Sequence, residues 1–245
     1  MSWQEQLDRQ FEEDVDWARW AVSRWDAFPV DREPRPLVLL GEVAHARNGF
    51  RSQRAKLAFM KGWIEPRVPL PDAVLEILGQ RPERPEREPA IVITAAERCA
   101  VEQRTDRGPR WLPGWELRSE QTLGPIVVLD PDVIARAWEP GEPDPPRPTR
   151  GQPRHDPARA DLADDGRTLT FRFTGALPNY ERYPTAEVIE SGQAVAVVPH
   201  GEDIGPPGAR ILPGYGHRVA ITLREPLGAR VLVDLHGNAG EVTER

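Results

Sequence analysis

Residues Arg107–Trp115 carry the side chains best suited to binding chemistry in this chain of 245 residues. Among glycines and prolines, the segment holds two guanidiniums and two indoles, on Arg107, Arg110, Trp111 and Trp115. A guanidinium can hold a carboxylate or phosphate with paired hydrogen bonds, and an indole can stack on a ring. The segment therefore indicates an anionic or aromatic ligand site on a loop. The alternative, which we favour, is a loop pinned over the core by its tryptophans, with the arginine ends in water.

Three C-terminal side chains have the chemistry of metal ligands: His217, Asp234 and His236. They could meet if the two apolar segments that flank residues 225–229 pair as a hairpin. In such a hairpin the alternation of side chains directs His217 inward, whereas Asp234 and His236 point outward. Because a metal site needs ligands that converge, we predict no metal site here. We expect Asp234 to pair with Arg218 on the outward face instead.

The single cysteine, Cys99, is a further candidate for chemistry. A reactive thiolate needs a neighbouring base or cation, and no histidine lies near Cys99 in the sequence. We therefore expect a buried structural thiol. The sequence also lacks the motifs of phosphate loops, dinucleotide-binding folds, serine hydrolases and zinc proteases, so it predicts no catalytic residue and no cofactor. A lone cysteine excludes an internal disulfide and is ordinary for a cytoplasmic protein.

Composition and net charge exclude several classes of protein. A chain of this length forms one large or two modest domains. Apolar residues make up 39% of it, and none of its apolar runs reaches the roughly 20 residues of a membrane span. The first residues lack the basic and apolar regions of a signal peptide. The net charge of −7 argues against a nucleic-acid binder.

The charges are unevenly distributed along the chain. Residues 1–30 carry seven acidic and three basic side chains, whereas residues 47–67 carry six basic and one acidic. Only two of the 32 basic residues are lysines, Lys56 and Lys61. The simplest interpretation is that complementary surfaces dock within the chain, and the alternative is that one of them binds a partner.

Residues 1–28 have the pattern of one amphipathic helix. Its apolar stripe follows steps of three and four residues along Trp3, Leu7, Phe11, Val15, Ala18, Val22 and Trp25. Ser2 and Glu5 form a capping-box pattern at its start. Trp17 and Trp20 lie off the stripe, so they are candidate anchors for a partner or for self-association. The alternative, which we favour, is that other parts of the chain cover them.

Short strands and helices are expected as far as residue 138. Apolar, partly β-branched runs indicate strands at residues 37–40, 90–94 and 126–129. Residues 72–78 indicate a helix. Residues 56–64 fit either a helix or a hairpin, and the pattern leaves both open.

The C-terminal half begins with a proline-rich stretch and continues as alternating strands. Residues 139–160 hold seven prolines and predict a linker or a wrapping arm. Further on, residues 186–198 predict a hairpin that places Val188 opposite Val195, and residues 218–235 predict a second hairpin. Several short strands separated by glycine and proline turns are typical of a small antiparallel β-sandwich.

Two parts of the chain show a resemblance to a known family. The string TDRGPRWLP at residues 105–113 resembles a segment of two-part actinobacterial proteins that have no assigned activity. The strings RVAITL at residues 218–223 and PLGARVLVD at residues 226–234 are similar to the C-terminal part of the same family. The resemblance implies a two-part layout and implies no chemistry.

The sequence thus predicts an α+β fold in three parts. An N-terminal amphipathic helix with a mixed helix and strand part occupies residues 1–138, a proline-rich linker residues 139–160, and a β-sandwich-like domain residues 161–245. We expect a cytoplasmic, non-catalytic protein-interaction or assembly protein that binds a protein partner or itself, and neither nucleic acid nor a membrane. The alternative is a small-molecule binder or enzyme that uses the Arg107–Trp115 segment as its ligand site.

Overall fold

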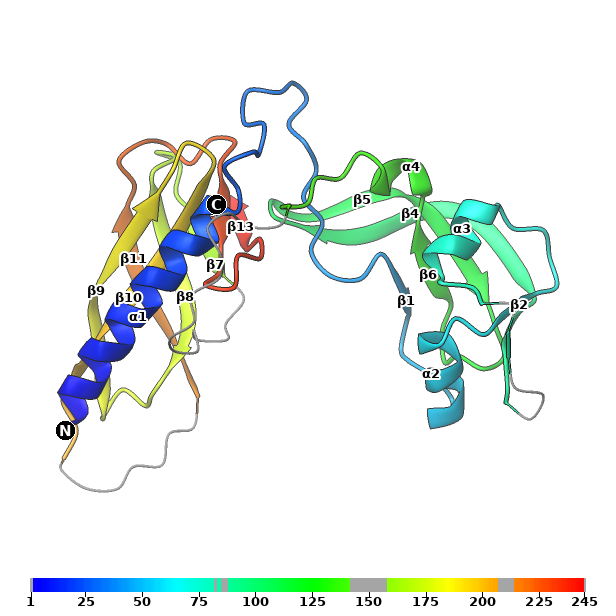
Figure 1. Cartoon of the computed structure of the whole chain (residues 1–245), viewed down its shortest axis with the longest axis horizontal. Coiled ribbons are helices and arrows are strands. Elements are labelled where there is room, and N and C mark those ends of the chain that lie inside the picture. The colour runs from blue at the N-terminus through cyan, green and yellow to red at the C-terminus, as the bar shows by residue number, and fades with distance from the viewer. Residues whose placement is uncertain (1, 82, 85–87, 142–157, 207–213, 245) are drawn as a thin grey trace. The chain divides into compact units, whose positions relative to one another are not determined.

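A computed structural model describes residues 2–81, 83–84, 88–141, 158–206 and 214–244. The chain forms two compact units (Figure 1). Unit 1 comprises Met1–Leu40, Thr105–Gly108 and Trp138–Arg245, and unit 2 comprises Gly41–Arg104 and Pro109–Ala137. A long N-terminal helix accompanies many strands, most of them in antiparallel pairs, so the predicted α+β class is confirmed.

Each unit contains its own helices and sheets. Unit 1 is built from α1 (Trp3–Ser23), β7 (Arg159–Leu162), β8 (Thr168–Gly175), β9 (Glu181–Glu190), β10 (Ala194–Asp203), β11 (Tyr215–Thr222), β12 (Val231–Val233) and β13 (Glu241–Glu244). Unit 2 is built from β1 (Ala44–Ala46), α2 (Gln53–Met60), β2 (Ile64–Pro66), α3 (Asp72–Ile77), β3 (Ile91–Ile93), β4 (Ala95–Thr105), β5 (Gly108–Arg118), β6 (Ile126–Leu129) and α4 (Pro131–Ile134). The turn Thr105–Gly108 between β4 and β5 belongs to unit 1.

The start of α1 follows the predicted capping box. The Ser2 hydroxyl accepts the backbone N–H of Glu5, and the Glu5 carboxylate accepts the backbone N–H of Ser2 at 2.6 Å. These two bonds satisfy donors that the first helical turn leaves open. The helix ends at Ser23, earlier than predicted, and the chain continues in turns such as the bond from the Phe28 N–H to the Trp25 carbonyl at 2.7 Å.

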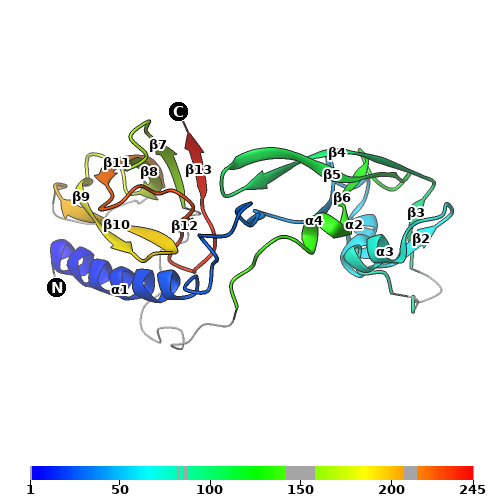
Figure 2. The ribbon, with the colours of Figure 1, turned by 90° about the horizontal axis from the view of Figure 1, so that it is seen from above.

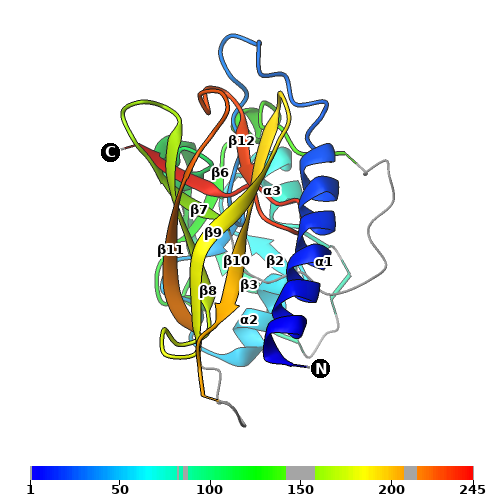
Figure 3. The ribbon, with the colours of Figure 1, turned by 90° about the vertical axis from the view of Figure 1, so that its left-hand side faces the viewer.

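Unit 1 consists of two facing sheets with α1 on the outside. The sheet β12-β10-β9 and the sheet β11-β8-β7-β13 enclose one apolar cluster, to which β10 contributes Val195 and Val197. The other face of β10 presents Ala194, Ala196 and Val198 to α1, which lies along it (Figures 2 and 3). Strand β10 is therefore buried on both faces, and the predicted sandwich carries a helix as a third layer.

The position of α1 differs from the division expected at residues 1–138. The helix packs on β9 and β10, so it belongs with the C-terminal strands. The reason is the apolar outer face of β10, which needs a cover and whose alanines let a helix approach closely. In the predicted linker, residues 142–157 lie outside the described residues. Its expected end at 160 is wrong, because Ala160 pairs with Phe171 within β7 and β8.

The two predicted hairpins had different outcomes. Strands β9 and β10 do form the first hairpin, but Val188 lies opposite Val197 instead of Val195. The turn is displaced by one residue, which leaves the same side chains on the apolar face. The second hairpin does not form: β11 pairs with β8 in the other sheet, and β12 runs parallel to β10. Both strands have apolar faces that suit either arrangement, so alternation alone did not identify their partners.

Unit 2 combines the sheet β1-β6-β5-β4 with the parallel pair β2 and β3. The strands β3 and β6 lie within the segments predicted at residues 90–94 and 126–129. Residues 37–40 form only an isolated bridge, from Leu39 to Thr105. The ambiguous segment is helical in its first part, because α2 ends at Met60, just before Gly62 with φ +69°.

Candidate functional site

The Arg107–Trp115 segment is a strand and not a loop. Residues from Gly108 onward form β5, which pairs with β6 through matches such as Trp115 with Val128. Arg107 alone lies in the turn before it, where Gly108 has φ +83°, a conformation that favours glycine. The expectation of a loop is therefore wrong, because the glycines and prolines here mark a tight turn and an irregular strand.

Arg107 is a structural donor. Its Nη2 donates to the carbonyl oxygens of Gly228 at 2.7 Å and Arg230 at 2.6 Å. Beside it, the buried Asp106 carboxylate accepts two hydrogen bonds from Arg35. These bonds join the turn before β5 to the loop that leads into β12.

The loop between β11 and β12 is also fixed by a buried ion pair between Arg230 and Glu190. Arg230 Nη1 lies 2.8 Å from Glu190 Oε2, and the two side chains are only 8% and 9% exposed. The Nη2 group of Arg230 donates to the carbonyl oxygens of Glu225 at 2.7 Å and Pro226 at 3.0 Å. Guanidinium groups thus bind the carbonyls of this loop from both sides, which fixes the connection between the two sheets of unit 1.

The other three predicted site residues of this segment lie in unit 2. Trp115 is half-buried against the core, with the Arg98 guanidinium 5.0 Å from its ring centre. Arg110 is exposed, and Trp111 is 68% exposed although it lies within β5. Trp111 is thus a large, mostly apolar side chain exposed on the surface of unit 2.

Unit 2 has a shallow hollow elsewhere, beside β2. Its volume is about 260 Å³, and its walls include Trp63, Glu65, Arg81 and Arg84. One Arg84 nitrogen lies 3.6 Å from the Glu65 carboxylate, so part of this charge is internally balanced. The hollow contains none of the predicted site residues. This hollow is therefore distinct from the ligand site predicted from the sequence.

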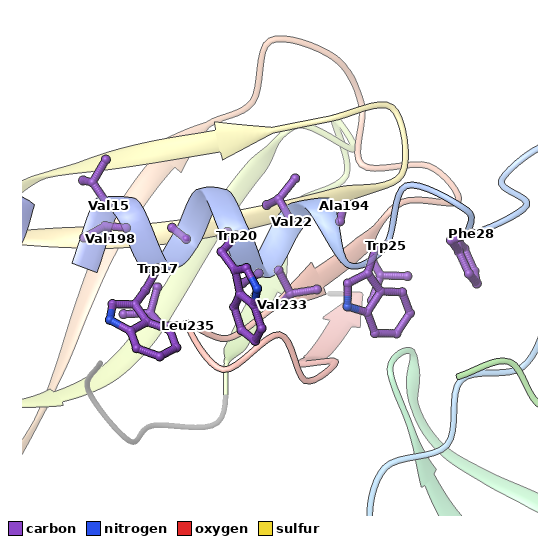
Figure 4. Packing of buried hydrophobic residues seen from close by; sticks show 14 of the residues in the cluster. Val15, Trp17, Trp20, Val22, Trp25, Phe28, Ala194, Val198, Val233 and Leu235 are labelled. Atoms are coloured by element: carbon purple, nitrogen blue, oxygen red, sulfur yellow. The ribbon is translucent and has the colours of Figure 1, made fainter. Parts of the chain in front are cut away.

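Trp17 and Trp20 are buried in unit 1, with 3% and 7% of their surface exposed. Their rings meet edge to face with centres 5.5 Å apart, and both lie in the cluster that includes Val233 and Leu235 (Figure 4). The Arg24 guanidinium covers the Trp20 ring at 5.5 Å. The end of β12 and the residues after it therefore pack against the side of α1 that carries Trp17 and Trp20, outside the predicted apolar stripe. These two indoles are thus covered by the chain itself.

Two of the three candidate metal ligands, His217 and Asp234, make separate contacts with the backbone. His217 Nε2 donates to the Ala176 carbonyl at 2.6 Å, and Asp234 accepts the backbone N–H groups of His236 and Asn238, each at 2.9 Å. The expected pairing of Asp234 with Arg218 is wrong, because Arg218 lies on β11 whereas Asp234 follows β12, which belongs to the other sheet. Throughout the described ranges, no cluster of three histidine, cysteine or acidic side chains is arranged to hold a metal ion.

Cys99 lies half-buried on β4. Burial raises the pKa of its thiol, and the Glu116 carboxylate raises it further. A raised pKa keeps the sulfur protonated at neutral pH, which is the opposite of what a nucleophilic cysteine needs.

A second exposed surface lies on and beside α2, within the basic residues 47–67 that the sequence analysis gave as an alternative binding surface for a partner. We call it the α2 surface, and it comprises Arg51, Arg54, Lys56, Leu57, Met60 and Lys61. Leu57 is 43% exposed and Met60 71%. The excess of positive charge over residues 47–67 was the sequence signal for this surface. The sequence did not reveal that Leu57 and Met60 are exposed, because apolar residues in a helix are ordinarily expected in the core.

Comparisons with known proteins supply no relative for this chain. No family model, no curated protein and no solved structure matches it. Across the described residues, none of the helices has the length and apolar character needed to cross a membrane.

Proposed function

We propose that this chain is a cytoplasmic, non-catalytic protein that acts by binding another protein. The observation that carries the proposal is Trp111, whose side chain is 68% exposed on β5. Tryptophan is enriched among the residues that dominate the free energy of protein association. A strand paired in a sheet also presents the indole at a fixed position, so little conformational entropy is lost when a partner covers it.

The neighbourhood of Trp111 supports the same function. Arg110, the preceding residue of β5, is exposed on the opposite side of the strand, and arginine is also among the residue types enriched in binding hot spots. The rival role as a ligand clamp would need Arg107 to release the carbonyls of Gly228 and Arg230. We also propose that the chain belongs to the two-part actinobacterial family that it resembles. Two of the segments that carry the resemblance, residues 105–113 and 226–234, are joined by the hydrogen bonds from Arg107 to the carbonyls of Gly228 and Arg230.

The test is a comparison of captured proteins in the native host. The tagged full chain is compared with Trp111→Ala and with Tyr215→Ala, a control on β11 whose side chain is 48% exposed. Loss of a hot-spot side chain costs about 2 kcal/mol or more, which is over ~10-fold in affinity. We expect at least one captured protein to fall by about that factor with Trp111→Ala and to persist with Tyr215→Ala. Identical sets of proteins for all three chains would refute the proposal.

A further inference from the structure

We propose that the α2 surface docks an acidic segment of a partner protein, which places an apolar side chain between Leu57 and Met60. The inference rests on the proposed binding function and assigns a second surface, with residues distinct from Trp111. It specifies the chemistry of the partner, namely carboxylates around an apolar anchor.

The first argument is the orientation of α2. The helix turns its small residues, Ala55 and Ala58, into the core of unit 2, where they are 4% and 0% exposed. Of its three large apolar residues, Phe59 packs partly buried against the same core, whereas Leu57 and Met60, three positions apart on one face, are left outside. A helix that only served its own core would gain little from apolar side chains at these two exposed positions, since free energy is gained only where apolar surface is buried.

The second argument is the charge around these two side chains. Arg51, Arg54, Lys56 and Lys61 are exposed, and within the described part of the chain no carboxylate forms an ion pair with them. The neighbouring Arg47, in contrast, reaches Glu116 at 2.7 Å. An apolar centre with a charged rim is the ordinary composition of a protein interface. A partner with a rim of carboxylates would complement the four cations, which have no ion pair among the described residues.

A protein segment fits this surface better than the other polyanions. A lipid surface is bound by a wide apolar face, and the short α2 offers only Leu57 and Met60. A nucleic acid would gain from the cations but would leave the two apolar side chains without a counterpart. An acidic amphipathic segment uses both features.

The two lysines allow a selective test. Lys56 and Lys61 are the chain's only lysines and both belong to this surface. In host extract, a carbodiimide joins a lysine amine to a nearby carboxylate as an amide with loss of water, and mass spectrometry maps the joined peptides. We expect Lys56 or Lys61 to be joined to an aspartate or glutamate of one other protein. Raising the salt from about 0.15 M to 1 M should lower the yield, because the Debye length falls from ~8 Å to ~3 Å.

Two double variants distinguish the loss of the crosslinking amines from the loss of partner binding. Lys56→Arg with Lys61→Arg keeps the charge, so it should retain the partner in capture and lose the crosslink. Leu57→Ala with Met60→Ala keeps both amines, and it should lower the crosslink yield at least ~10-fold, as expected for an apolar anchor. An unchanged yield for this alanine pair would overturn the inference.

Three further results would also overturn it: crosslinks only to carboxylates of this same chain, no crosslink through either lysine, or Leu57-dependent sedimentation with vesicles of phosphatidylglycerol and phosphatidylcholine. The proposed function is judged separately, by the Trp111→Ala capture. A partner that depends on Trp111 without lysine crosslinks would leave that function standing and remove the α2 surface from it. No loss of any captured protein with Trp111→Ala, together with an unchanged crosslink yield for Leu57→Ala with Met60→Ala, would refute both.

Discussion

Replacing Trp20 with alanine tests whether the indoles of α1 serve the fold or an interface. The side chain is 7% exposed, meets Trp17 edge to face, and lies under the Arg24 guanidinium. Truncation of a buried tryptophan to alanine costs about 3–5 kcal/mol. The aromatic pair and the cation over the ring place the expected loss in the upper part of that range.

The assay must report on unit 1 alone, because the chain has two units. Pulsed hydrogen exchange at increasing urea, read by mass spectrometry on peptides of β10, meets this requirement. With an m-value of about 2 kcal/mol/M, a loss of roughly 4 kcal/mol lowers the urea midpoint by about 2 M. The matched control is Trp111→Ala, the same substitution at a side chain that is 68% exposed, which should change stability by no more than ~0.5 kcal/mol.

The contrary result is equally specific. If Trp20→Ala moved the midpoint no further than Trp111→Ala and lowered the sedimentation mass, Trp20 would be an interface residue and the burial argument would be refuted. A large loss of stability at an unchanged sedimentation mass would support the argument.

Three other predictions concern single groups. Glu190→Ala leaves the Arg230 charge buried without its partner and should cost about 3–5 kcal/mol in urea unfolding of unit 1, whereas a loss under ~1 kcal/mol would contradict the buried pair. Cys99 should react with iodoacetamide more slowly than a free thiol at pH 8, because burial and then Glu116 raise its pKa; Glu116→Gln should speed the reaction, and equal rates by intact mass would contradict this. Asp165 should titrate below its ordinary value in a carboxyl NMR titration, because three hydrogen bonds favour its charged form. Its stabilisation is then complete above the unfolded pKa and lost as the pH falls through the folded one, a dependence that Asp165→Asn should remove.

Local signals predicted the elements that depend on neighbours in the sequence. The capping box at Ser2 and Glu5 begins α1 as expected, and the run at 126–129 is β6. These features depend on hydrogen bonds within a few residues or on the burial of one short segment. Strand partners depend on contacts far along the chain, which explains why β11 and β12 were assigned to each other although they lie in different sheets.

The candidate site was predicted less well, since residue type does not reveal whether a polar group is already occupied. Arg107 and Arg110 look alike in the sequence, yet the first is bound to two carbonyls and the second is exposed. Trp17 and Trp111 differ in the same way, at 3% and 68% exposure. What separates the members of each pair is the surrounding fold, and only the position of α1 and of the turn before β5 reveals it.

The cations of this chain divide by the geometry of their head groups. Arg35, Arg107 and Arg230 each bind several oxygens at once, which a planar guanidinium with five N–H donors can do and an ammonium on a flexible stem cannot. The two lysines stand on α2 and at its C-terminal cap, where they need only supply charge at the surface. Exchange of lysine for arginine should therefore be tolerated on α2, whereas the reverse exchange at Arg230 would leave loop carbonyls in unit 1 without donors. This division separates the residues that hold the sandwich together from those available to a partner.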